Sequence, residues 1–219
     1  MRFAVFRLLS CVLLSVGSIV HMANLIYIHQ TSFIKQSFCL SWMSIYATIL
    51  YFGLTLKAFW MGFVGDSELH ILNFTYHFAL LTQLCTTTLY NMMPYEQHNS
   101  LETLGNFLIH GVGLLLLIID LAMNRIEFLI EVPKLMIAFS VGYMGILVVY
   151  SCRCGDLYEG VRWCSNELPA LLMTGMFLYG LFIFVWIGLG FLNVAKFKFR
   201  AGENVIAQFE NFVGGVLGL

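Results

Sequence analysis

The sequence predicts an all-α membrane protein, a six-transmembrane-helix bundle with both termini in the cytoplasm. Composition is the first reason. The chain of 219 residues is 60% hydrophobic and 11% charged, whereas a soluble domain is typically about 45–50% apolar and about 25% charged. The second reason is spacing, because the apolar residues form long runs separated by short polar breaks. One globular core cannot hide this excess, so the bilayer is expected to solvate most of it.

Six segments are long enough to cross a bilayer, which takes roughly 20 mostly apolar residues. The breaks between them are short and carry polar or turn residues. Residues 1–200 are therefore expected to form a single domain, followed by a short tail over 201–219. The segments are 5–28, 38–62, 71–92, 104–123, 133–151 and 169–195.

The first segment has the Arg2 and Arg7 charges and the apolar run of a signal peptide. The run continues to about Ile28, however, and no small-residue cleavage motif ends it. We expect a retained first helix.

The basic residues orient the predicted bundle. Loops rich in Lys and Arg stay in the cytoplasm, and the 11 basic residues divide eight to three between the two sides. This places both termini in the cytoplasm and predicts a multi-pass protein of the endoplasmic reticulum or the plasma membrane. A net charge of −1 argues against a nucleic-acid partner. The larger group is Arg2, Arg7, Lys57, Arg125, Lys134, Lys196, Lys198 and Arg200; the smaller is Lys35, Arg153 and Arg162.

The cysteines divide between the surface and the predicted helices. Cys39, Cys152, Cys154 and Cys164 fall on the outer side, where an oxidising compartment permits pairing. One structural disulfide or free thiols is the simplest interpretation. A metal site is less expected, because C-x-C without nearby His is a weak signal.

The fourth segment, with "GNFLIHGVGLLLLIIDL", raises the main functional question. His110 is expected about two turns below the outer surface, and Asn106 lies one turn earlier on the same face. Asp120 is about 15 Å away along the axis, too far to orient His110. We expect Asp120 to reach the cytoplasmic interface or to pair with Arg125.

The second segment carries a stripe of hydroxyl residues. Small hydroxyl residues let helices pack closely, so packing is the plain interpretation of the stripe. Ser41 also suits chemistry. It lies in the first helical turn, where backbone N–H groups lack helical partners, at a depth similar to that of His110. An imidazole that removes the hydroxyl proton, with amides that bind an oxyanion, is what acyl transfer needs. The stripe is Ser41, Ser44, Thr48 and Thr55.

Other roles for His110 remain open at this point. It is a structural histidine if its ring bonds a backbone carbonyl or a neighbouring hydroxyl. Haem ligation would need histidine pairs at matched depth, and His21 is the one partner on the outer side. A proton relay or transporter is a further alternative, although the sixth segment has no ionisable residue.

The chain resembles the androgen-induced and androgen-dependent membrane proteins, six-helix hydrolases of fatty acid esters of hydroxy fatty acids. The resemblance is carried by "NFLIHGVG" in the fourth segment, "FSVGYMGILVV" in the fifth and "YFG" at 51–53. The family uses a threonine near the start of helix two and a histidine in helix four. His110 matches the histidine. Ser41, in "LSW", stands where the family has threonine.

The resemblance implies an intramembrane lipid esterase with a branched fatty acid ester as substrate and no cofactor or metal. Ser41 is the expected nucleophile and His110 the base. Asn106 and Thr48 are candidate substrate-binding residues, and Thr48, about 10 Å deeper, is also the second candidate nucleophile. The rival hypothesis is a non-catalytic multi-pass protein that binds membrane lipids or regulates a partner.

Overall fold

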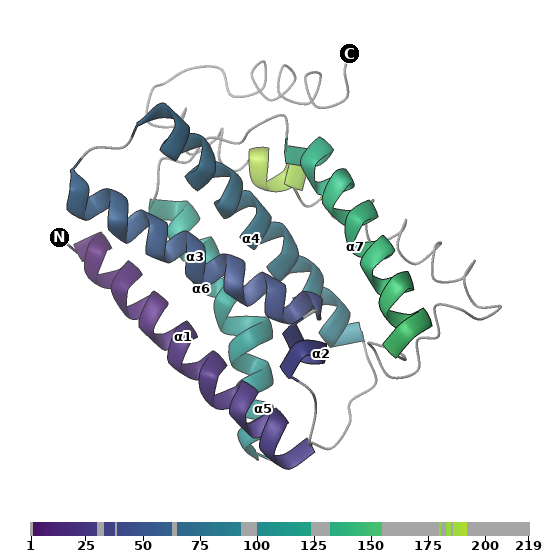
Figure 1. Cartoon of the computed structure of the whole chain (residues 1–219). Helices are drawn as coiled ribbons and strands as arrows, with labels where there is room; N and C mark the ends of the chain where they lie inside the picture. The colour runs from purple at the N-terminus through teal and green to yellow at the C-terminus, as the bar shows by residue number, and fades with distance from the viewer. Residues whose placement is uncertain are drawn as a thin grey trace. The chain divides into compact units, whose positions relative to one another are not determined.

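The computed structural model describes residues 2–29, 33–37, 39–62, 65–92, 100–123, 132–154, 180, 183–184 and 186–191. Over these residues all regular structure is helical (Figure 1), which confirms the all-α prediction. The chain divides into two units, Met1–Ile126 and Glu127–Leu219, and the first contains every candidate site residue.

The first unit holds four long helical stretches and one short helix. The last three elements of this unit join without a break, so residues 100–123 form one continuous helical run. The elements are α1 (Arg2–His29), α2 (Phe33–Ser37), α3 (Leu40–Met61), α4 (Asp66–Met92), α5 (Ser100–Phe107), η1 (Leu108–Val112) and α6 (Gly113–Met123).

The observed helices lie over the predicted segments with small shifts at their ends. The exception is α2, which falls in a break that was expected to be a loop. In the second unit, α7 (Val132–Cys154) covers the fifth segment. Most of the sixth segment, 169–195, and the whole tail 201–219 lie outside the described residues.

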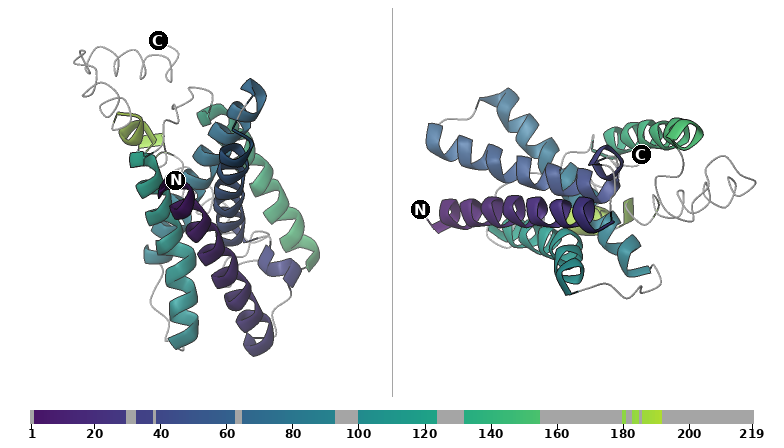
Figure 2. Two further views of the ribbon diagram at one scale, coloured as in Figure 1. Left: turned by 90° about the vertical axis from the view of Figure 1, so that its left-hand side faces the viewer. Right: turned by 60° about the horizontal axis from the view of Figure 1, so that its bottom comes forward.

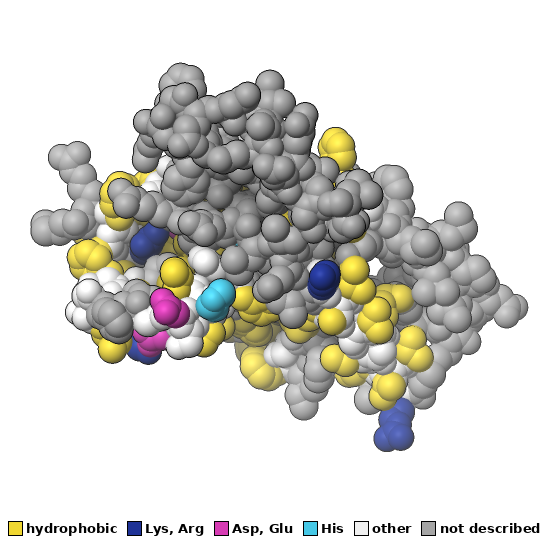
Figure 3. Space-filling view, turned by 90° about the horizontal axis from the view of Figure 1, so that it is seen from above, with side chains coloured by type: hydrophobic (Ala, Val, Ile, Leu, Met, Phe, Trp, Pro, Cys, Tyr) yellow, Lys and Arg dark blue, Asp and Glu magenta, His cyan; other side chains and the backbone are white. Residues whose placement is uncertain are grey.

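Helices α3 and α4 form an antiparallel pair joined by a glycine turn. α3 ends at Gly62, whose φ of 65° is left-handed, a conformation that glycine adopts without strain. Beside this turn, Lys57 pairs with Glu68 at 3.1 Å, with both side chains exposed. The hydrogen bond and charge of Lys57 hold the pKa of Glu68 below its usual value. Figure 3 shows charged side chains at this end next to apolar ones, as expected near a membrane surface.

The run of residues 100–123 packs antiparallel to α1 and parallel to α3 (Figures 1 and 2). Along α1, Arg7 contacts Asp120, whereas Gly17 lies against the Leu108 side chain. Along α3, Tyr51 also contacts Asp120. These contacts set the register of the three helices.

Glycines allow two of these close approaches. A Cβ at Gly105 would lie 1.9 Å from Nδ1 of His21, so α5 meets α1 where only glycine fits. A Cβ at Gly113 would lie 2.8 Å from Nε2 of Gln83 and 3.3 Å from Cδ1 of Ile45. Small residues that let backbones approach are characteristic of helix interfaces in membranes.

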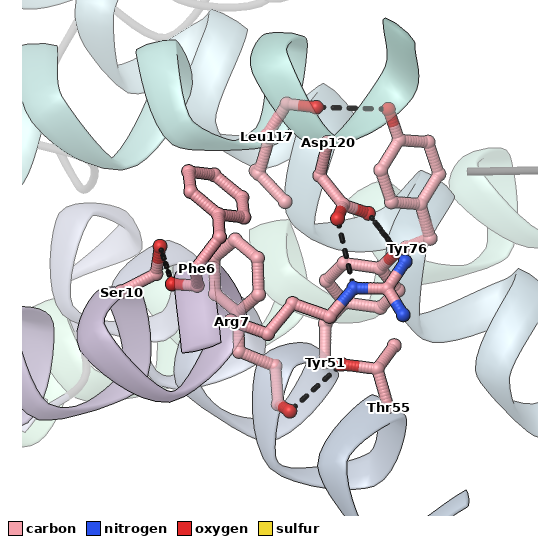
Figure 4. A network of polar contacts seen from close by, with 9 residues as sticks. Phe6, Arg7, Ser10, Tyr51, Thr55, Tyr76, Leu117 and Asp120 are labelled. Carbon is pink, nitrogen blue, oxygen red and sulfur yellow. Dashed lines mark hydrogen bonds and ion pairs between the residues drawn. The ribbon is translucent and has the colours of Figure 1, made fainter. Parts of the chain in front are cut away.

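A charged network lies within the first unit (Figure 4). The Arg7 guanidinium donates from Nε to Oδ1 of Asp120 at 2.9 Å and from Nη2 to Oδ2 at 3.4 Å. The Tyr51 hydroxyl donates to the same carboxylate. Nearby, the Tyr76 hydroxyl donates to the Leu117 carbonyl at 3.2 Å. The network therefore connects α1, α3, α4 and α6.

The position of Asp120 corrects the expectation from sequence. Its exposed fraction is 0%, so it does not reach an interface, and it pairs with Arg7, 113 residues earlier. The partner expected from sequence, Arg125, lies outside the described residues. A carboxylate this deep needs a cation and hydrogen bonds to offset its desolvation, and Arg7 and Tyr51 supply both.

Two described helices are long and apolar enough to cross a membrane, Phe3–Tyr27 and Thr103–Met123. The apolar side chains exposed along α1 suit a face in contact with lipid tails. They include Phe3, Leu9, Val12, Val16 and Ile19.

The glycine contact at α5 generates a stability prediction. Gly105→Ala should destabilise the protein by about 1–3 kcal/mol, as overpacking does, because the His21 ring occupies the space of the new methyl group. The matched control is Gly53→Ala, where no atom lies within 4 Å of the new Cβ. Thermal unfolding in detergent measures both. Equal melting temperatures for the two variants would contradict this packing.

The buried ion pair generates a second prediction. Arg7→Met should cost about 3 kcal/mol or more, because it leaves the Asp120 carboxylate buried without its cation. The double variant Arg7→Met/Asp120→Leu should recover much of that loss. Lys57→Met, which breaks the exposed pair, serves as the control and should leave the melting temperature almost unchanged. Additive losses in the double variant would refute the pairing.

Candidate active site

His110 lies in a π-helical turn. Within Leu108–Val112 the helix widens, and the Gly113 N–H donates to the Leu108 carbonyl, five residues earlier. Such turns are rare and often mark functional sites. Thr87 of α4 donates its hydroxyl proton to the His110 carbonyl. A side chain from the neighbouring helix therefore bonds a backbone group of the widened turn.

The His110 ring is packed rather than hydrogen-bonded at its Nδ1 atom. It stacks on Tyr90 of α4, with ring centroids 4.4 Å apart and planes at 8°. Its Nδ1 is buried and has no hydrogen-bond partner among the described residues. The structural alternative, a ring bonded to a carbonyl or hydroxyl, is thus not observed at Nδ1.

A second imidazole, His21 of α1, lies against Gly105, which precedes His110 by five residues. The His21 ring stacks on Trp42 with centroids 5.9 Å apart. Helices α1, α3 and α5 therefore converge beside His110. Within the part of the chain that the structure describes, no group of three or more His, Cys, Asp or Glu is placed to hold a metal ion.

Ser41 lies in the first turn of α3, half-buried, directly before Trp42. Its level in the bundle follows from the parallel packing of α3 and the run 100–123. Ile45, one turn after Ser41, lies at Gly113, which is one turn after His110. Ser41 and His110 therefore occupy the same level, and α3 contacts η1. No hydrogen bond joins the two side chains in the described part of the chain.

The backbone amides at the start of α3 differ in part from expectation. The amides of Trp42 and Met43 donate to the Cys39 carbonyl at 3.0 and 3.1 Å, so the prediction of free first-turn amides is wrong for these two. The Ser41 amide makes no hydrogen bond with any described residue. It is the donor in this turn that remains open to an oxyanion.

Thr48 and the rest of the hydroxyl stripe behave as packing residues. Thr48 has an exposed fraction of 0% and donates to the Ser44 carbonyl at 2.8 Å. Ser44 donates to the Ser41 carbonyl and lies 3.4 Å from the Thr86 hydroxyl of α4. Thr48 is also nearly two turns further along α3 than Ser41, so the structure does not bring it to the level of His110.

Asn106 lies on α5, one turn before His110, and is half-buried. Its side chain makes no hydrogen bond to the described residues, so it lies one turn from His110, toward Ser100, without a partner among them. Of the four cysteines expected on the outer side, Cys164 and the side chains of Cys152 and Cys154 lie outside the described residues.

The structure adds residues that the sequence reasoning passed over. Tyr90, Thr87 and Gln83 all come from α4, on the face that meets η1 and α6. In the sequence, Gln83 could have pointed to this face of α4. It is a polar residue within an apolar helix, and polar side chains inside membrane segments usually have a role. A separate groove of about 100 Å³ lies at the other end of α3. Its lining comprises Leu54, Lys57, Ala58, Met61, Glu68, Ile71 and Leu72.

Comparisons with protein-family models, curated proteins and solved structures found no match. The geometry around His110 therefore carries the functional argument.

The contact between Thr87 and His110 generates a third prediction. Thr87→Val should destabilise the protein by about 1–2 kcal/mol, because the His110 carbonyl loses its donor. The matched control is Thr88→Val, since Thr88 donates within its own helix, to the Leu84 carbonyl. Chemical denaturation in detergent compares the two. A larger loss for Thr88→Val would show that the interhelical bond is unimportant.

Proposed function

We propose that this protein is a multi-pass membrane hydrolase that cleaves a lipid ester with a serine nucleophile, Ser41, and a histidine base, His110. The observation that carries the proposal is the common level of these two residues, fixed by the contacts of Ile45 with Gly113 and of Tyr51 with Asp120. The π-helical turn at His110 adds to it.

The reaction would run in two steps, acylation of Ser41 and then hydrolysis of the acyl-serine. His110 takes the proton of the Ser41 hydroxyl as the oxygen attacks the ester carbonyl carbon. The alkoxide leaving group receives that proton, which releases the alcohol and leaves an acyl-serine. A water molecule then gives its proton to His110 and attacks the acyl group. The fatty acid departs, and the proton returns to Ser41.

The Ser41 amide is the donor in place for the oxyanion. An N–H aimed at developing negative charge in a low-dielectric site is among the stronger contributions to catalysis. The other first-turn amides, of Trp42 and Met43, are already bonded.

The membrane setting favours an amphiphilic substrate. With six spans and cytoplasmic termini, Ser41 and His110 lie in the outer part of the bilayer, and an ester at this depth can keep its chains in lipid. The resemblance of "NFLIHGVG" and "FSVGYMGILVV" to the androgen-induced family supports fatty acid esters of hydroxy fatty acids as the substrate class. Asn106, at the outer end of the site, is then the candidate for the substrate carboxylate, and Thr48 contributes packing rather than contact.

A fluorophosphonate probe tests the proposal. Membranes containing the wild type should be labelled and should hydrolyse a branched fatty acid ester. Ser41→Ala and His110→Ala should each lose more than about 100-fold in turnover. Ser10→Ala is the control, because Ser10 donates within α1, to the Phe6 carbonyl, far from the site. Expression of every variant is checked by immunoblot.

Two results would contradict the proposal. Full turnover in Ser41→Ala would move the nucleophile elsewhere, with Thr48→Val the next variant. No labelling and no turnover in the wild type would favour a lipid-binding protein in which His110 holds helices together.

A further inference from the structure

The His110 ring lies face to face with the ring of Tyr90, which belongs to the last turn of α4. The ring centroids are 4.4 Å apart and the ring planes differ by 8°. Aromatic pairs in proteins usually have centroids about 4.5–7 Å apart, so this pair is at the short end of the range. One face of the imidazole is therefore covered by an aromatic ring from another helix.

Helix α4 holds His110 at a second point. The Thr87 hydroxyl donates to the His110 carbonyl, and Thr87 precedes Tyr90 by three residues. Residues three apart on a helix lie on the same face. The same face of α4 therefore fixes the backbone of His110 through Thr87 and its ring through Tyr90.

No hydrogen bond from the described residues orients the ring at Nδ1. This atom is buried and has no partner among them. In a Ser-His-Asp triad, a carboxylate bonds this nitrogen, orients the imidazole and stabilises the imidazolium that forms. Asp120, ten residues after His110, is bound to Arg7 and Tyr51 instead. Both tasks of the triad carboxylate thus need another group at His110.

An aromatic face can perform both tasks. A flat ring packed against the imidazole restricts its rotation. The same face attracts a cation that lies within about 6 Å of the ring centroid, and the attraction is stronger where water is excluded. The separation of 4.4 Å is within this limit. Both side chains are half-buried, so water screens the contact only in part.

We infer that Tyr90 is a positioning residue for His110, with its ring in place of the triad carboxylate. The Tyr90 face fixes the plane of the imidazole and stabilises the imidazolium that forms when His110 takes the Ser41 proton. The ring face, and not the Tyr90 hydroxyl, is the part that acts. The stabilisation of the cation rests on the proposed function, whereas the restraint of the ring does not.

Nuclear magnetic resonance of the full-length protein in detergent micelles, with ¹³C-labelled histidine, tests the restraint. Spectra are recorded at alkaline pH, where an imidazole is neutral, and the His110 signals are assigned by their loss in His110→Gln. Protons that lie over an aromatic face are shifted upfield. The wild type and Tyr90→Phe should show this shift, and Tyr90→Leu should lose it. The matched control is Phe74→Leu, because the Phe74 ring pairs with Phe78 within α4.

The kinetic readout separates positioning from substrate binding. Tyr90→Leu should lower kcat by about tenfold or more with KM nearly unchanged, because the imidazolium loses its support in the transition state. Tyr90→Phe should keep most of the wild-type kcat, and Phe74→Leu should keep all of it. A rise in KM alone for Tyr90→Leu would overturn the inference, as Tyr90 would then contact the substrate. A Tyr90→Phe variant as slow as Tyr90→Leu would also overturn it, because the hydroxyl would then be the active part.

The inference can be tested even if Tyr90→Leu does not fold. His110 signals without the upfield shift in the wild type would overturn it without any variant. The shift in both the wild type and Tyr90→Phe would support it. A wild type that shows the shift but hydrolyses no ester would support the restraint of the ring and reject the proposed function.

Discussion

The arrangement of the first unit depends on the buried ion pair between Arg7 and Asp120. A carboxylate with no exposed surface is tolerable only while its cation and hydrogen-bond donors stay in place. Arg7 comes from α1 and Tyr51 from α3, so Asp120 holds three helices in one register. A shift of any of them by a turn would leave a charge unpaired in the apolar interior. Packing of alkyl side chains alone imposes no comparable penalty.

That register has consequences at the other end of the helices. With Arg7 at Asp120, the antiparallel α1 brings His21 to Gly105. With Tyr51 at Asp120, the parallel α3 brings Ile45 to Gly113 and Ser41 to the level of His110. The charged network and the candidate site lie about two to three turns apart, and one determines the alignment of the other.

Glycine and the π-helical turn explain how polar groups fit at this depth. Gly105 and Gly113 lack the Cβ that would collide with His21 and Gln83. The widened turn is bonded at the His110 carbonyl by Thr87. Most hydroxyls of α3 are used within their own helix, as Thr48 and Thr55 are. This leaves Ser41, at the helix start, as the hydroxyl of the stripe that is free for chemistry.

The sequence by itself determined the helical class, the approximate helix ranges and the two residues on which the proposal rests. Composition and the spacing of polar breaks are local properties of the sequence. In a bilayer, an apolar run forms a helix because a helix pairs its backbone N–H and C=O groups within the segment. His110 was identifiable because an imidazole in an apolar run is rare. Only the tertiary structure decided the partners. The Arg7–Asp120 pair joins residues 113 positions apart, and Tyr90 and Thr87 reach His110 from another helix. The π-helical turn and the bonded amides of Trp42 and Met43 depend on backbone geometry, which residue identity does not specify.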